Sequence, residues 1–260
     1  VLERGTKTAS GSYILLPAHI GTFSVCFGKL MHHPDTRKLP FSYLIAYGED
    51  MYLIPGRNLT TVGLYRDIRK WPKRDHRPSD GKNSIVNFDW LSPFSVGGIM
   101  TAKRTLEALR EVSGDVENYN FHDYIIKNSS LKKGVKYYGM AIDKFLGNSL
   151  ISRIQKGGSI TSIQELRAAL KPDSVNGLGE WIDLAGLIAP QASVAAILDD
   201  IENGLLSGVG SINARFSELH ARYYSDEWTW AREVIESYYG VDLDTISVEA
   251  LMNLVHRWKD

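Results

Sequence analysis

The sequence predicts an α+β fold, in which a small β-rich N-terminal part is followed by a larger, mostly α-helical domain. Residues 12–65 hold short runs of β-branched and aromatic residues separated by Gly, Pro, Asp and Asn, which is typical of strands. From residue 93 onward, apolar residues recur at helical spacing between capping residues. We therefore expect a β-rich segment with a basic loop at 1–90 and a helical domain at 91–260.

Four runs in the N-terminal part predict strands: SYILLP (12–17), TFSVCF (22–27), SYLIAY (42–47) and MYLIP (51–55). Between the last two, the sequence from Tyr47 to Asp50 predicts a hairpin turn. At Ile20-Gly21 the chain takes one hexapeptide-like step of the kind found in a parallel β-helix. A solenoid needs repeated steps, so this part is interpreted at most as the end of a parallel β-helix.

Capping residues and apolar spacing predict the helices of the second part. Pro93 suits a first helical turn, and the apolar spacing that follows continues to Gly114. A connection of turn-like residues is expected at 113–120. Further helices are expected over about 129–146 (ended by Gly147), from the capping pair Ser162 and Glu165 to Leu170, from Pro190 to Gly204, over 212–239, and after Ser247.

The small and apolar run at 184–190 predicts a segment that packs closely against a helix. We expect its neighbour Trp181, together with Leu184, Leu187 and Ile188, to be buried against the helical stretch at 212–239.

The composition of the 260-residue chain is that of an ordinary globular protein, with 43% hydrophobic and 23% charged residues. It contains no apolar run of membrane-spanning length and no signal peptide, so no membrane partner is expected. The single cysteine, Cys26, lies in an apolar run, which favours a buried core residue over a nucleophile. The absence of disulfides fits a cytoplasmic location. Because the chain begins at Val1 and reads as if mid-element, we expect a piece of a longer protein.

Opposite charges gather in the two parts of this neutral chain. Residues 1–171 carry 25 Lys and Arg against 15 Asp and Glu, whereas residues 172–260 carry 5 against 15. The split favours contact between the two parts, within a chain or across a homo-oligomer, over an outside anionic partner. Overall neutrality and the acidic C-terminal part disfavour nucleic acid.

The cations are densest between Arg66 and Arg77, where six of them surround Trp71. Guanidinium groups match phosphate oxygens bidentately, so this segment is a candidate site for a phosphorylated small molecule. No Walker motif and no GxGxxG motif accompanies it, and no cofactor is expected. The candidate anion-binding residues are Arg57, Arg66, Arg69, Lys73 and Arg74. The alternative is that these cations pair with acidic residues of the protein itself.

Catalytic residues are unknown from the sequence, and His32, His33 and Asp35 are weak candidates for proton transfer. Adjacent histidines on a strand point to opposite faces, which argues against their sharing a metal ion. No metal-binding spacing occurs elsewhere, so no metal is expected, and a structural turn is the favoured interpretation of this segment.

Several runs resemble a known family: LPFSYLI (39–45), IPG (54–56), VGLYRDIRKWPKRD (62–75), FLGNSLISR (145–153), GEWIDLAGLIAP (179–190) and WTWA (228–231). They look like the region after the β-helix in long, uncharacterised bacterial proteins. Those proteins carry hexapeptide-repeat, left-handed β-helix domains like those of sugar-nucleotide acyltransferases and nucleotidyltransferases. The resemblance covers nearly the whole chain, but no residue matches a known catalytic motif.

The resemblance implies the C-terminal module of a hexapeptide-repeat, sugar-nucleotide-type, transferase-like protein that binds an anionic, phosphorylated metabolite. If the chain is an enzyme, it is expected to share a transferase active site with a β-helix region. The alternative is a structural oligomerisation module without catalytic activity of its own, in which oppositely charged parts of neighbouring subunits meet.

Overall fold

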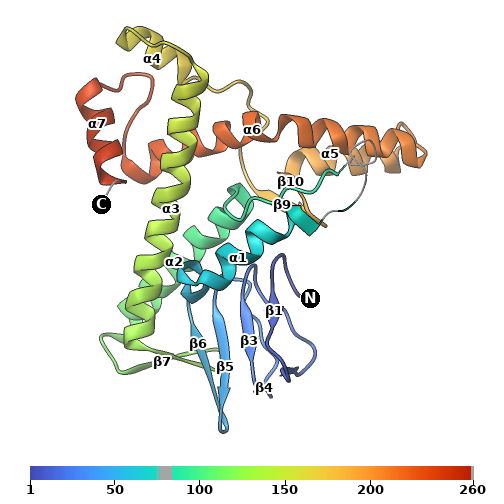
Figure 1. The fold of residues 1–260 in the computed structure, drawn as a ribbon, viewed down its shortest axis with the longest axis vertical. Helices are drawn as coiled ribbons and strands as arrows, with labels where there is room; N and C mark the ends of the chain where they lie inside the picture. Colours follow the sequence, from blue (N-terminus) through green and yellow to red (C-terminus); the bar gives the residue numbers. More distant parts are fainter. Residues whose placement is uncertain (75, 77–83, 259–260) are drawn as a thin grey trace. The chain divides into compact units, whose positions relative to one another are not determined.

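A computed structural model describes residues 1–74, 76 and 84–258 and shows the expected α+β fold, with a small β-rich N-terminal part followed by helices (Figure 1). The chain divides into two compact units. The first comprises the described parts of 1–82, 88–90 and 95–142, and the second those of 83–87, 91–94 and 143–260. The first unit extends past residue 90 because a later hairpin joins its sheet.

A six-stranded sheet forms the centre of the first unit, with the strand order β1-β3-β5-β6-β8-β7. Its strands are β1 (Lys7–Thr8), β3 (Val25–Phe27), β5 (Tyr43–Tyr47), β6 (Asp50–Ile54), β7 (Asn118–Phe121) and β8 (Tyr124–Lys127). A separate pair is formed by β2 (Tyr13–Ile14) and β4 (Lys29–Leu30). The predicted hairpin is confirmed, because β5 and β6 pair antiparallel, with Tyr47 opposite Asp50 and Gly48 at a φ of 63°.

The first three strands of this sheet pair in parallel at a constant offset. Lys7 pairs with Val25 and Val25 pairs with Tyr43, so each strand lies 18 residues after its neighbour. An isolated parallel bridge from Leu2 to Ile20 has the same offset. Parallel strands need a long connection, and here irregular chain with the short β2 and β4 strands supplies it in place of a helix. Successive turns of chain therefore stack in register.

A left-handed residue recurs at the same point of each turn. Gly5, Phe23 and Phe41 have φ angles of 67°, 53° and 57° and are again 18 residues apart. A Cβ on Gly5 would lie 2.2 Å from the Phe23 ring, so only glycine leaves room for that ring. The Phe23 ring in turn stacks on Phe41, with centroids 4.9 Å apart. We call these left-handed positions the corners of the turns. The corner residue of each turn packs against the corner residue of the next turn.

Helices accompany the strands of the first unit, which includes one long helix from residue 95 onward and another up to residue 142. After the 3₁₀ turn η1 (Arg57–Thr60) come α1 (Val62–Lys70) and the 3₁₀ turn η2 (Pro72–Arg74). The long helices α2 (Pro93–Ser113) and α3 (Asn128–Lys156) follow. Tyr138 of α3 is fully buried and donates a hydrogen bond of 2.7 Å to the Pro40 carbonyl. Buried apolar residues of the unit include Cys26, Leu44, Leu53, Val96, Ile99, Leu106, Ile126 and Leu131.

Two expectations for this region are wrong. The segment expected to be a turn-like connection at 113–120 contributes part of the β7–β8 hairpin, whose turn places His122 at a φ of 51°. Helix α3 does not end at Gly147 but continues to Lys156. A Cβ on Gly147 would lie 3.0 Å from the Trp258 ring, so this glycine permits close packing and does not terminate the helix.

The second unit contains a two-stranded hairpin and helices. These are β9 (Trp181–Leu184), β10 (Leu187–Pro190), α4 (Ile163–Ala169), α5 (Gln191–Glu202), α6 (Val209–Tyr239) and α7 (Val248–Arg257). The predicted caps are confirmed, because the Ser162 and Ser247 hydroxyls accept from the Glu165 and Ala250 amides at 3.2 and 3.1 Å. Pro190 immediately precedes α5, and α6 ends at Gly240 in the left-handed conformation.

The segment at 184–190 was expected to pack as a helix neighbour and is instead part of the β9–β10 hairpin. Ala185 and Gly186 both have positive φ, and the Gly186 amide donates to the Asp183 carboxylate at 2.6 Å. Trp181, Leu187 and Ile188 are buried as expected, but Leu184 is 43% exposed. Leu187 belongs to the unit's core cluster with Ala189, Val194, Ile197 and Leu219. None of the helices in the described parts of the chain is long and apolar enough to cross a bilayer.

Candidate functional site

A cavity of about 320 Å³ lies beside the basic segment in the first unit. Strands β1, β3 and β5, which lie side by side in Figure 1, form one wall, and helix α1 forms the other. The lining includes three aromatic side chains, Phe27, Tyr43 and Trp71, and the charged pair Lys7 and Asp67. Its size falls within the usual range for small-molecule sites.

Charged groups from two distant segments meet at this cavity. The Lys7 ammonium on β1 forms a hydrogen-bonded ion pair with the Asp67 carboxylate on α1, and the Arg66 Nε lies 3.4 Å from the same carboxylate. Burial acts to raise the pKa of Asp67, but Lys7 and then Arg66 outweigh it, so the pKa lies below its ordinary value. Two cations therefore share one ionised carboxylate, which leaves this edge of the cavity with net positive charge.

The structure separates the five predicted anion-binding residues into groups. Arg66 lies next to Asp67, whereas Arg69 follows Asp67 by two positions, which places it on another side of the helix. The Arg57 Nη1 donates to the Thr60 hydroxyl at 2.9 Å within η1. Lys73 and Arg74 are exposed in η2, and no carboxylate within residues 1–74, 76 and 84–258 pairs with them.

Asn58, which is also part of the cavity lining, is engaged by the protein itself. Its Nδ2 donates to the Phe23 carbonyl at 2.7 Å, and its Oδ1 accepts from the Thr61 hydroxyl at 2.6 Å. Thr61 also caps α1, since its hydroxyl accepts from the Leu64 amide at 3.5 Å. These bonds fix the start of α1 and hence the position of Asp67 relative to the sheet.

The residue that sequence reasoning missed is Lys7. It lies 60 positions before Asp67, and no local pattern connects the two. Only the parallel stacking of β1 on β3 brings Lys7 to the cavity. Trp71 was visible as the aromatic centre of the basic segment, and it stacks on Phe23 with the ring centroids 6.0 Å apart.

The weak catalytic candidates lie elsewhere in the first unit. His32 and His33 are exposed, and within the described residues neither forms an ion pair with Asp35. Asp35 instead accepts from Arg37, with the Nε at 2.9 Å from Oδ1. This hydrogen bond is the main cause of the lowered pKa of Asp35. The structure therefore pairs Asp35 with Arg37 and not with either of the two histidines.

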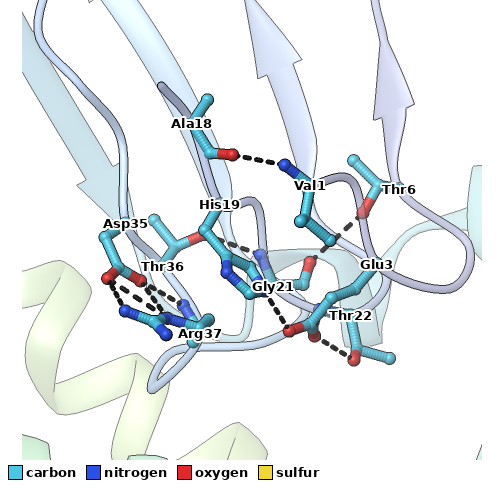
Figure 2. A network of polar contacts seen from close by, with 10 residues as sticks. All are labelled: Val1, Glu3, Thr6, Ala18, His19, Gly21, Thr22, Asp35, Thr36 and Arg37. Carbon is cyan, nitrogen blue, oxygen red and sulfur yellow. Dashed lines mark hydrogen bonds and ion pairs between the residues drawn. The ribbon is translucent and has the colours of Figure 1, made fainter. Parts of the chain in front are cut away.

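A different histidine, His19, does meet a carboxylate. Figure 2 shows the Glu3 carboxylate contacting both His19 and Thr22, with the Asp35–Arg37 pair near His19. The His19 Nε2 lies 2.8 Å from Glu3, which also accepts from the Thr22 amide and hydroxyl at 2.9 and 2.7 Å. Three hydrogen bonds to one carboxylate tie together successive turns of the chain. In the described part of the chain, no three His, Cys, Asp or Glu side chains gather into a group that could hold a metal ion.

Cys26 is fully buried, and burial raises the pKa of its thiol to about 12. The thiol is protonated at neutral pH, so it is a poor nucleophile. The expectation of a core residue is confirmed.

In the second unit, Asp226 of α6 is a buried carboxylate with its side chain only 2% exposed. Burial raises its pKa, against the opposing charge of Arg222 (3.6 Å) and a hydrogen bond from Ser174 (3.2 Å). The folded state then binds the proton of Asp226 more tightly than the unfolded state does. Its contribution to stability is most favourable below the unfolded pKa, near 3.9, and declines as pH rises toward the folded pKa.

We expect the free energy of unfolding of Asp226→Asn, relative to that of the natural protein, to increase as pH rises from about 4 to 7. The asparagine does not titrate and keeps an oxygen that can accept from Ser174. Urea unfolding of both proteins at several pH values measures the difference. A pH-independent difference would show that Asp226 titrates alike in the folded and unfolded states.

The fold and cavity define an α+β protein with a ligand-sized cavity beside a basic helix, with a net positive charge at the edge where Lys7 and Arg66 share Asp67. Comparison with known families gives two matches: residues 1–110 match a domain of unknown function (DUF4954), and residues 162–260 match another (DUF6819). Both descriptions agree with the expected resemblance to an uncharacterised family, and neither names a hexapeptide repeat. No curated protein and no solved structure matches the chain.

Proposed function

We propose that the chain binds a phosphorylated metabolite in the cavity between β1, β3, β5 and α1. The observation that carries the proposal is that Asp67, which lines the cavity with Lys7, is shared between Lys7 and Arg66, which lies outside the lining. A phosphate can displace Asp67 from one or both cations, because it offers more acceptor oxygens and a higher charge. The aromatic side chains Phe27, Tyr43 and Trp71 offer surfaces for a sugar or base attached to that phosphate.

We further propose that this site belongs to the end of a left-handed β-helix in a hexapeptide-repeat, transferase-like protein of the sugar-nucleotide type. The support is the constant 18-residue offset between β1, β3 and β5, which equals three six-residue steps per turn. The recurring left-handed corner at Gly5, Phe23 and Phe41 agrees with this repeat. In such a protein the cavity adjoins the last turns, where a bound phosphate can serve an active site shared with preceding turns.

We expect Lys7→Gln to weaken the binding of phosphorylated ligands by about ten- to a hundredfold, since a charge-assisted hydrogen bond is worth about 1.5–3 kcal/mol. Calorimetric titration with glucose 1-phosphate, UDP-glucose and inorganic phosphate is the measurement. Lys29→Gln is the matched control, because Lys29 is an exposed strand residue that does not line the cavity.

Equal affinities of the natural protein and Lys7→Gln for every ligand that binds would place the phosphate elsewhere. The next variants to measure would then be Arg69→Gln and Arg74→Gln, which remove cations of the basic segment outside the cavity lining. If none of the three ligands binds the natural protein, the proposed function is wrong.

The alternative function is a structural oligomerisation module. The observation that favours it is β1, which lies at the edge of the sheet and pairs with β3 alone among the described strands. An unpaired strand edge is a template for pairing with another chain. Sedimentation tests this alternative by showing whether the chain self-associates. Comparison at low and high salt separates pairing of the basic and acidic parts, which salt screens, from strand pairing, which it does not.

A further inference from the structure

The six-stranded sheet has a second apolar face besides the one that is buried. Along β5, β6 and β8, Leu44, Leu53 and Ile126 are fully buried on one face. Their neighbours Ile45, Tyr52 and Ile125 are half-buried and lie on the other face, because side chains alternate along a strand. Ile45 pairs with Tyr52, and Tyr52 pairs with Ile125, so the three form one row across the sheet.

This row forms the wall of a cavity of about 330 Å³. The lining is mainly apolar and aromatic, with one ammonium and one aliphatic hydroxyl: Ile45, Tyr47, Tyr52, Leu53, Ile54, Ile125, Lys127 and Ser130. A mainly apolar cavity of this size with a few polar groups is the usual form of a small-molecule site.

The Lys127 ammonium lies over an aromatic ring of the apolar row. Its Nζ lies 5.3 Å from the centroid of the Tyr52 ring, and the Tyr52 hydroxyl donates to Asp50 at 3.2 Å. In the described ranges of the chain, no carboxylate forms an ion pair with Lys127, whereas the nearby Lys132 pairs with Asp115 at 3.1 Å. The Tyr52 ring therefore orients the ammonium while leaving its N–H groups available to an anion.

Ser130 lies in the first turn of α3 and lines the same cavity. The backbone N–H groups of a first helical turn lack partners within the helix and favour negative charge. Lys127 and Ser130 thus define an anion-accepting end, and Ile45, Ile54 and Ile125 define an apolar surface next to it.

We propose that this groove binds a small organic anion with an apolar body, of the class of acyl carboxylates. The carboxylate meets Lys127 and Ser130, and the acyl chain covers the row of Ile45, Tyr52 and Ile125. This site differs from the α1 cavity, where the lysine is already paired with Asp67. It therefore stands independently of the proposed phosphate site.

Calorimetric titration of the full chain with octanoate, acetate and 1-octanol tests the proposal. Octanoate carries both chemical features, acetate only the charge and octanol only the chain. We expect octanoate to bind at least about tenfold more tightly than either, a difference of about 1.4 kcal/mol. Failure of octanoate to bind, or equal binding of octanol, overturns the proposal.

Variants locate the site. We expect Lys127→Gln and Tyr52→Leu each to weaken octanoate binding by about tenfold or more. Only Lys127→Gln is expected to leave octanol binding unchanged, because Tyr52 also belongs to the surface that the chain covers. Lys133→Gln is the control, because Lys133 is exposed on the same helix and does not line the groove. Full octanoate affinity in both Lys127→Gln and Tyr52→Leu, or an equal loss in Lys133→Gln, contradicts the assignment. Unchanged glucose 1-phosphate binding by Lys127→Gln would show that the two sites are separate.

Discussion

Leu187→Ala is expected to lower the free energy of unfolding of the second unit by about 2–5 kcal/mol, the usual cost of emptying a buried leucine site. Leu187 is 1% exposed and packs in the cluster with Val194, Ile197 and Leu219. These residues come from β10, α5 and α6, so the cavity left by the truncation lies where three elements meet. The side chains of these elements support one another, which limits how far the site can collapse.

Leu184→Ala is the matched control for this measurement. Leu184 lies directly opposite Leu187 in the hairpin register but is 43% exposed, so its loss is expected to cost under about 1 kcal/mol. Hydrogen exchange of the β9–β10 and α5 amides during urea titration reports on this unit by itself. If Leu184→Ala and Leu187→Ala lower the free energy of unfolding by similar amounts, Leu187 is not the more deeply buried of the two, and the described packing of the hairpin is wrong.

Gly21→Ala is expected to destabilise the stacked turns of the first unit by about 1–3 kcal/mol or more, as overpacking does. A Cβ on Gly21 would lie 2.3 Å from the Thr36 carbonyl oxygen, which belongs to the backbone and cannot rotate away. The Gly21 amide also donates to the Thr36 hydroxyl at 3.0 Å, so moving the chain apart breaks a buried hydrogen bond. Faster hydrogen exchange in β1 and β3 is the expected signature.

Gly139→Ala serves as the control in the same unit. Gly139 lies inside α3, where a Cβ would meet only the end of the flexible Lys103 side chain at 3.9 Å. Alanine in a helix interior is favoured over glycine by about 0.5–1 kcal/mol, so this variant is expected to be slightly stabilised. A Gly21→Ala protein as stable as the natural one would contradict the close stacking of the turns.

The sequence predicts the helices best because their signals are local. Ser247 caps α7 through the amide three residues later, and Gly240 ends α6 through its own φ angle. The hairpin at 181–190 was missed because a small-residue run also suits helix packing. The available signal was Asp183 followed by Ala185 and Gly186, which together form the turn.

The candidate sites were less accessible to sequence reasoning because they combine distant segments. The concentration of cations around Arg66 could be counted in the sequence. Lys7, however, reaches Asp67 only because β1 pairs in parallel with β3. Likewise, Lys127 meets Tyr52 because β8 pairs with β6 across 73 positions of the chain. Periodicity within one segment carries no information about such pairings.

The constant offset between the first strands also limits how this protein can change its length during evolution. A one-residue insertion between Thr8 and Val25, if taken up by the strand, would exchange the two faces of β3, exposing Cys26 and burying Val25 and Phe27. If it falls before Phe23, it would also move Phe23 out of line with Gly5. Insertions between the strands can bulge outward and leave the strand register unchanged. Lengthening the stack itself requires the addition of whole 18-residue turns.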